Sequence, residues 1–267
     1  MTVKGFDISR NEKEVDYAGA KAAGMEFGYV CTWAGGFQDL RGEEHRLGIQ
    51  KAGMLAGPYY VWNKGNATAS GEPERMMKLA EGFELIPSLD FEKYVGEADL
   101  PPREFCINWL GNFTTGLNRI YKDKKLFYTN LDGINHLKPI PDWLVDNWLL
   151  YLSLPGSTWT PERIAPWKIV TVHQYQIDTS TSWGKGVDLD GCNVPLDEIK
   201  RKSYTPPPPP EEEEFTQIVA DLSKRLAALE GWQGQAIISL TAICKRQDNA
   251  ENKLAAIETW ARNIGLK

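Results

Sequence analysis

The chain has 267 residues, of which 42% are hydrophobic and 25% are charged, and its formal net charge is −6. This composition is typical of a globular protein, and the lack of a Lys/Arg block excludes nucleic acid as an expected partner, because phosphate binding needs concentrated positive charge. No apolar run reaches the roughly 18 residues needed to cross a bilayer. Residues 1–9 also lack the basic and apolar regions of a signal peptide. We therefore expect neither membrane insertion nor nucleic-acid binding.

Up to about residue 140, extended and helical segments alternate, which indicates β/α units and a parallel sheet. The extended patterns lie at 5–8, 27–32, 55–62, 87–91 and 125–129, and the helical patterns at 15–23, 43–52, 72–82, 101–110 and after 130. Three more extended segments follow at 148–152, 168–175 and 186–189, without convincing helices. Five β/α units and three further strands predict an α/β fold, a TIM-like β/α barrel, although a doubly wound open sheet would give a similar pattern.

The composition changes sharply near residue 205. Five consecutive prolines at 206–210 precede four glutamates at 211–214. Polyproline rises about 3.1 Å per residue, so this spacer is semi-rigid and roughly 15 Å long. We therefore expect a barrel domain at 1–204, a Pro/Glu linker at 205–214 and a helical tail at 215–267.

Apolar or small residues recur in the tail at alternating steps of four and three, which is the a/d pattern of a coiled coil over about seven heptads. The series is Phe215, Val219, Leu222, Leu226, Leu229, Gln233, Ala236, Leu240, Ile243, Gln247, Ala250, Leu254, Ile257, Ala261 and Ile264. It predicts a homo-oligomer, because Leu at a with Ile at d favours trimers or tetramers. Gly231 and Gly234 interrupt the pattern. Since each helical glycine costs about 1 kcal/mol relative to alanine, a two-helix hairpin is the alternative.

Acidic side chains occupy the ends of three predicted strands. Asp90 and Glu92 close the fourth strand, and Phe91 between them points to the opposite face because side chains alternate along a strand. Asp7 ends the first strand and Asp188 lies in the last. Catalytic residues gather at the C-terminal ends of barrel strands, so we expect these carboxyl groups to converge.

Such a cluster suits glycoside hydrolysis. One carboxyl group protonates the leaving oxygen, and an ionised one stabilises the oxocarbenium-like transition state. Repulsion between the carboxylates raises the pKa of at least one, which makes an acid usable near neutral pH. The alternative is that Asp90 and Glu92 form a chance pair on a solvated loop. The presence of Asp7 and Asp188 at other strand ends favours the catalytic interpretation. Cys31, Cys106, Cys192 and Cys244 and three histidines are scattered without metal-ligand spacing, so no metal or cofactor is expected.

Six short motifs, in order, make the first 200 residues resemble the family 25 glycoside hydrolases, muramidases found in phages, bacteria and fungi. They are Gly5-Phe6-Asp7-Ile8-Ser9, Gly57-Pro58-Tyr59-Tyr60, Asp90-Phe91-Glu92, Tyr128-Thr129-Asn130, His173-Gln174-Tyr175 and Val187-Asp188-Leu189-Asp190. Three positions depart from the family pattern. Tyr60 stands where the family often has His, His173 where it usually has Trp, and Asp190 where it usually has Asn.

The resemblance implies the same barrel and cleavage of the β-1,4 bond between N-acetylmuramic acid and N-acetylglucosamine in bacterial peptidoglycan. It implies that Glu92 is the general acid and that Asp90 is either the nucleophile or the group that orients the substrate's N-acetyl group. Asp7 and Asp188 would be supporting carboxylates. The resemblance also suggests a phage endolysin or virion-associated lysozyme, held in the host cytoplasm before release to the cell wall or carried on the virion.

Several aromatic residues at or just after strand ends are candidates for binding sugar, although aromatic rings also pack ordinary barrels. With the neighbouring glutamine, the candidates are Trp33, Tyr60, Trp62, Tyr128, Gln174 and Tyr175. The rival function is a non-catalytic glycan-binding or structural phage tail component. The retained carboxyl groups argue against it, because a protein that only binds glycan needs no acid.

Overall fold

The computed structural model describes residues 2–12, 14–93 and 99–202. The predicted linker, the coiled-coil tail and its oligomer lie outside these described residues. The strands are β1 (Val3–Ile8), β2 (Phe27–Ala34), β3 (Phe37–Gln38), β4 (Leu55–Val61), β5 (Ser88–Asp90), β6 (Lys125–Asn130), β7 (Trp148–Ser153), β8 (Val172–Thr179) and β9 (Val187–Cys192). The helices are α1 (Tyr17–Ala22), α2 (Gly42–Lys51), α3 (Glu72–Leu79), α4 (Arg103–Ile120), α5 (Leu131–Leu137), α6 (Asp142–Asn147), α7 (Pro161–Ile164) and the short 3₁₀ helix η1 (Leu196–Glu198).

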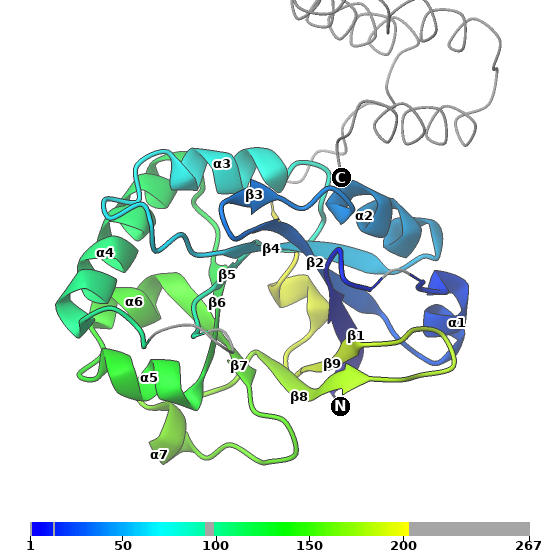
Figure 1. Cartoon of the computed structure of the whole chain (residues 1–267). Coiled ribbons are helices and arrows are strands. Elements are labelled where there is room, and N and C mark those ends of the chain that lie inside the picture. The colour runs from blue at the N-terminus through cyan, green and yellow to red at the C-terminus, as the bar shows by residue number, and fades with distance from the viewer. Residues whose placement is uncertain (1, 13, 94–98, 203–267) are drawn as a thin grey trace, which may run out of the picture. The chain divides into compact units, whose positions relative to one another are not determined.

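The strands form a closed barrel, as Figure 1 shows. In the described part of the chain the sheet order is β1-β9-β8-β7-β6-β5-β4-β2-β3, and a parallel pairing of β1 with β2 closes the ring. The two-residue β3 pairs with β2 outside this ring. The other neighbours run parallel except β9, which is antiparallel to both β8 and β1. The predicted TIM-like α/β barrel is confirmed.

Helices connect the first strands on the outside of the barrel (Figure 1). After β7, the described residues contain only the four-residue α7 before β8, and β8 leads to β9 without a helix. This matches the predicted loss of helices in the last third of the barrel. None of the described helices is both long enough and apolar enough to span a bilayer.

Helix α4 is the largest difference from the predicted elements, because it continues to Ile120 where the sequence predicts an end at 110. Gly111 and Gly116 disfavour a helix by about 1 kcal/mol each. Phe113 and Leu117 nevertheless continue its buried face beneath α3, α5 and the sheet. Burying an apolar side chain of this size contributes about 1.5–3 kcal/mol, so packing outweighs the intrinsic preference.

Side chains alternate between the two faces of the barrel wall. Those facing out, such as Phe6, Leu89 and Phe127, pack under the helices. Those facing in include Tyr29 and Tyr151, which fill the lower interior with other apolar residues. The interior is therefore packed rather than open. A polar pocket remains at the end of the barrel where the parallel strands have their C-terminal ends.

Candidate active site

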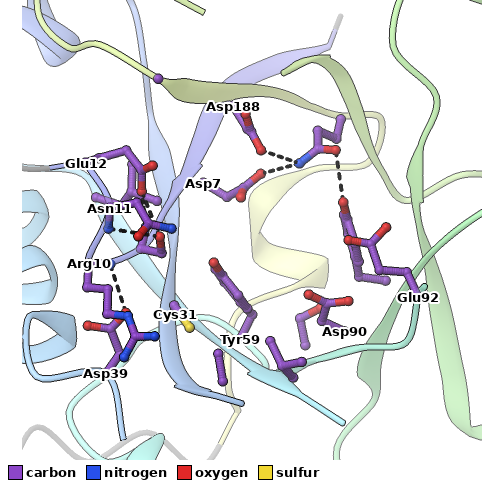
Figure 2. Close-up of a pocket in the computed structure, with 18 of the residues that line it drawn as sticks. Asp7, Arg10, Asn11, Glu12, Cys31, Asp39, Tyr59, Asp90, Glu92 and Asp188 are labelled. Carbon is purple, nitrogen blue, oxygen red and sulfur yellow. Dashed lines mark hydrogen bonds between the residues drawn. The ribbon is translucent and has the colours of Figure 1, made fainter. Parts of the chain in front are cut away.

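The four predicted acidic side chains line one pocket at the C-terminal end of the parallel strands, and Figure 2 shows them there with Glu12 and Asp39. Asp178 lines the pocket as well. Asp7 comes from β1, Asp90 from the end of β5, Glu92 from the residue pair after it, and Asp188 from β9. The cavity holds about 290 Å³. The structure thus brings together every carboxyl group that the sequence predicts for the site.

Strand geometry explains this convergence. Asp90 and Glu92 both face the pocket, whereas Phe91 is fully buried against Trp62 and Phe127 on the outer face of the wall. Because β9 runs antiparallel to β1, Asp188 near the start of β9 pairs in register with Asp7 near the end of β1. The reversed strand therefore delivers its carboxyl group to the same end of the barrel as the parallel strands.

The side-chain amide of Gln174 joins two of these carboxyl groups. Its Nε2 donates to Oδ2 of Asp7 at 2.9 Å and to Oδ2 of Asp188 at 3.2 Å. Its Oε1 accepts from the Tyr128 hydroxyl at 3.0 Å and from the Ser153 hydroxyl at 2.6 Å. Hydroxyl donors on one side and carboxylate acceptors on the other fix the orientation of the amide.

Glu92 holds its proton more strongly than an ordinary glutamate. Burial, opposed by a hydrogen bond from Asn130 and assisted by the negative charge of Asp188, raises its pKa to about 7. That bond joins Asn130 Nδ2 to Oε2 of Glu92 at 3.2 Å. Asn130 also caps α5, because its Oδ1 accepts from the backbone N–H of Gly133 at 2.9 Å, so the helix start holds the side chain in place.

The neighbouring carboxyl groups also retain protons unusually well. Burial, followed by the charge of Asp7, raises the pKa of Asp188 to about 8. Burial raises the pKa of Asp7 to about 6, although hydrogen bonds from Gln174 and Tyr151 lower it. Groups that repel one another's charge release their protons in successive steps, here between about pH 6 and pH 8. Near neutral pH the pocket therefore holds both protonated and ionised carboxyl groups, which acid catalysis of glycoside cleavage requires.

Solved structures with the same barrel include a family 25 lysozyme from Aspergillus fumigatus, which is 25% identical, with a TM-score of 0.66 over 74% of this chain and 97% of that one. The barrel has the fold of the family 25 lysozymes. A bacterial lysozyme from Streptomyces coelicolor matches at 17% identity and a TM-score of 0.65, over 74% of this chain and 95% of that one. The catalytic domain of an endolysin from a bacteriophage of Listeria monocytogenes matches at 20% identity and a TM-score of 0.57, over 74% and 96%. No protein-family model and no curated protein matches the chain.

In this family 25 lysozyme fold, only some of the predicted sugar-binding residues reach the pocket. Tyr128 and Gln174 line it. Tyr60 does not, because it is 0% exposed and its hydroxyl donates to Glu72 on α3. Tyr59, the preceding residue on β4, lines the pocket instead. The prediction that Tyr60 binds sugar is corrected by the alternation of the strand, which turns Tyr59 inward and Tyr60 toward the helices.

The remaining aromatic candidates are Trp33, Trp62 and Tyr175, and one of them contacts the site, because the Trp62 indole N–H donates to the backbone oxygen of Glu92 at 3.3 Å. Trp33 stacks on Tyr60 with ring centroids 5.9 Å apart and an interplanar angle of 3°, and the Arg75 guanidinium covers it at 4.4 Å. Trp62 is 3% exposed and lines a second cavity of about 350 Å³ with Lys64. Tyr175 packs on the outer cluster under α1 and α2. None of these three rings lines the pocket that holds the carboxyl groups.

The sequence analysis overlooked several residues that contact or line the site, and three of them lie close to the carboxyl groups. Tyr59 lines the pocket, Asn130 donates to Glu92, and the Tyr151 hydroxyl donates to Asp7 at 3.2 Å. The alternation of side chains around Asp90 on β5 does not predict which way Tyr59 on β4 points. That direction depends on the register in which the two strands pair. Within the described residues, no group of three His, Cys, Asp or Glu side chains is arranged to hold a metal ion.

Proposed function

We propose that this protein is a muramidase that hydrolyses the β-1,4 bond between N-acetylmuramic acid and N-acetylglucosamine in bacterial peptidoglycan. The observation that supports this most strongly is the convergence of Asp7, Asp90, Glu92 and Asp188 on one pocket of a family 25 lysozyme fold. A non-catalytic glycan-binding protein has no need to bury several carboxyl groups beside one another, because each buried charge costs free energy.

In the proposed reaction Glu92 is the general acid. Its carboxyl proton passes to the glycosidic oxygen as the bond from that oxygen to the anomeric carbon breaks. Asp90, on the same strand end, is its partner, either as the nucleophile at the anomeric carbon or as the group that orients the substrate's N-acetyl group. A water molecule then supplies hydroxide to the anomeric carbon, and its remaining proton returns to Glu92. The reaction needs only carboxyl groups and water, so we propose no metal and no cofactor.

Asp7 and Asp188 act as supporting carboxyl groups in this proposal. Their shared donor, Gln174, holds both in fixed positions, and the charge of Asp188 favours the protonated form of Glu92. Tyr59 and Tyr128 line the same pocket and supply ring surface for the sugar.

We further propose that the enzyme serves in phage release, stored in the host cytoplasm before it reaches the cell wall or carried on the virion. The likeness to the catalytic domain of a phage endolysin supports this setting. Expression in a host with and without a matching phage holin would test it. Lysis that requires the holin is expected of an endolysin, and lysis of cells only from outside is expected of an enzyme carried on the virion.

The bond specificity is tested by digesting purified peptidoglycan and identifying the new reducing ends by mass spectrometry. Reducing N-acetylmuramic acid is expected. Reducing N-acetylglucosamine or free stem peptides would overturn the proposal. Glu92→Gln should reduce turnover by about 10²–10⁴-fold, the usual contribution of general acid catalysis. Glu81→Gln, the same change at an exposed residue, is the matched control. A protein that binds glycan equally well in both variants and releases no fragments would support the non-catalytic alternative.

A further inference from the structure

A further acidic side chain, Asp190, lies inside the barrel but does not line the pocket. It is 0% exposed. On β9 it stands two residues after Asp188, on the same face of the strand, and it pairs in register with Gly5 of β1 and Gln174 of β8. Asp190 therefore lies in the layer of side chains directly below the proposed catalytic groups.

Asp190 shares one hydrogen-bond donor with Asp7. The Tyr151 hydroxyl donates to Oδ2 of Asp190 at 2.7 Å and lies 3.2 Å from Oδ2 of Asp7. A hydroxyl group has a single hydrogen, so it cannot fully satisfy two carboxylates at once. No N–H or hydroxyl donor of the described residues reaches Oδ1 of Asp190. If Asp190 were ionised, it would be a fully buried carboxylate that shares its hydrogen-bond donor, the Tyr151 hydroxyl, with Asp7.

Among the residues that the structure describes, none places a compensating positive charge beside Asp190. The titratable groups that interact with it from the packed strands are Asp7 on β1, Tyr29 on β2, Tyr151 on β7, Tyr175 on β8, and Asp188 and Cys192 on β9. Of these groups, the Tyr151 hydroxyl favours the carboxylate through its hydrogen bond, whereas the charges of Asp7 and Asp188 disfavour it. Burial, and then the charge of Asp7, raise the pKa of Asp190 well above its usual value, and the hydrogen bond that its acid form makes to Asp7 adds to this effect.

We propose that Asp190 is a positioning residue that remains a neutral carboxylic acid and donates its proton as a hydrogen bond to Asp7. It accepts the hydrogen of the Tyr151 hydroxyl and thereby holds the Asp7 carboxylate in place at the base of the pocket. A side-chain amide could make the same two bonds, accepting from Tyr151 and donating to Asp7. An asparagine at this position would therefore make the same two hydrogen bonds as the neutral Asp190, but it could not ionise.

The protonation state is tested first, independently of catalysis, by comparing the wild type with Asp190→Asn. At about pH 7 the infrared difference spectrum, wild type minus Asp190→Asn, should show the carbonyl stretch of a protonated, buried carboxyl group, because the variant lacks this acid. Identical spectra in this region would overturn the proposal.

Thermal stability gives a second test. An acid whose pKa is higher in the folded than in the unfolded state binds more protons when folded, so the wild type loses stability as pH rises above about 4. Asp190→Asn has no such group. The Tm of the variant relative to the wild type should therefore increase with pH, by several degrees between about pH 4 and pH 8. A difference in Tm that does not change with pH would contradict a neutral, buried Asp190.

The positioning role rests on the proposed muramidase activity and is tested by kinetics on peptidoglycan. Asp190→Leu fills the space without hydrogen bonds and should lower kcat by about 10- to 100-fold with little change in KM, as expected for a misplaced catalytic group. Asp190→Asn should recover most of that loss, to within about threefold of the wild type. Equal losses in two folded variants would overturn the positioning role. If the wild type cleaves no peptidoglycan, the proposed function fails, while the infrared and thermal tests still decide the state of Asp190.

Discussion

The side-chain nitrogen of Gln174 lies 2.9 Å from Oδ2 of Asp7, although the two residues are 167 positions apart in the sequence. The same nitrogen also reaches Asp188, so one amide on β8 links a carboxyl group on the adjacent strand β9 with one on β1, the strand beyond it. The Tyr128 and Ser153 hydroxyls hold the other end of the amide. This arrangement makes Gln174 the residue on which the relative positions of two site carboxyl groups depend.

Gln174→Glu should therefore be severe although it changes one side-chain atom. It replaces the shared donor by an acceptor and places another negative charge against Asp7 and Asp188. We expect kcat on peptidoglycan to fall by about 10²-fold or more, as for other losses of preorganised hydrogen bonding. The control is Gln176→Glu, which adds the same charge at an exposed position of the same strand. Similar activity in the two variants would contradict the role of the amide.

The pH profile of activity should fall on its alkaline side near pH 7, where Glu92 loses the proton it must donate. Since the charge of Asp188 raises the pKa of Glu92, Asp188→Asn should move this limb to lower pH. The shift should be smaller than one pH unit, because Asp188, with a pKa of about 8, is only partly ionised where Glu92 titrates. Asp132→Asn, at an exposed position of α5, should leave the limb in place. A limb that moves to higher pH in Asp188→Asn would show that the proton donor is another group.

Tyr60→Phe tests the position of Tyr60 outside the pocket. The change removes a hydroxyl that donates to Glu72, whose side chain is 1% exposed. Leaving a buried acceptor with one donor fewer should cost about 1–3 kcal/mol in the free energy of unfolding. The ratio kcat/KM should stay within about threefold of the wild type, because the ring faces the helices. Unchanged stability in urea denaturation would indicate a solvated hydroxyl and contradict the buried position.

The predicted tail, which lies outside the described residues, is tested by shortening the chain after Tyr204. If the heptad pattern forms a parallel coiled coil, the full chain should be a trimer or tetramer and the shortened chain a monomer. The shortened chain should still cleave soluble glycan but clear whole cells less well, because linked catalytic domains gain effective concentration on a repeating polymer. Light scattering measures both states. A monomeric full-length chain would favour the helical hairpin that turns at Gly231 and Gly234.

The sequence by itself determined the order of the elements and the identity of four of the acidic side chains in the pocket. Both are local properties. Alternation along a strand places Asp90 and Glu92 on one face and Phe91 on the other, independently of the rest of the chain. In the structure Asp90 and Glu92 line the pocket and Phe91 packs in the core outside it.

Tertiary structure alone decided how those side chains are joined and protonated. The antiparallel direction of β9, the register that sets Asp7 beside Asp188, and the choice of Tyr59 over Tyr60 depend on how strands far apart in the sequence pair. Asp190 is the clearest example of a residue whose state the sequence alone does not predict. Its charge state follows from complete burial beside Tyr151 and Asp7, from strands β7 and β1, and burial of a charge is a property of the closed barrel that no local pattern contains.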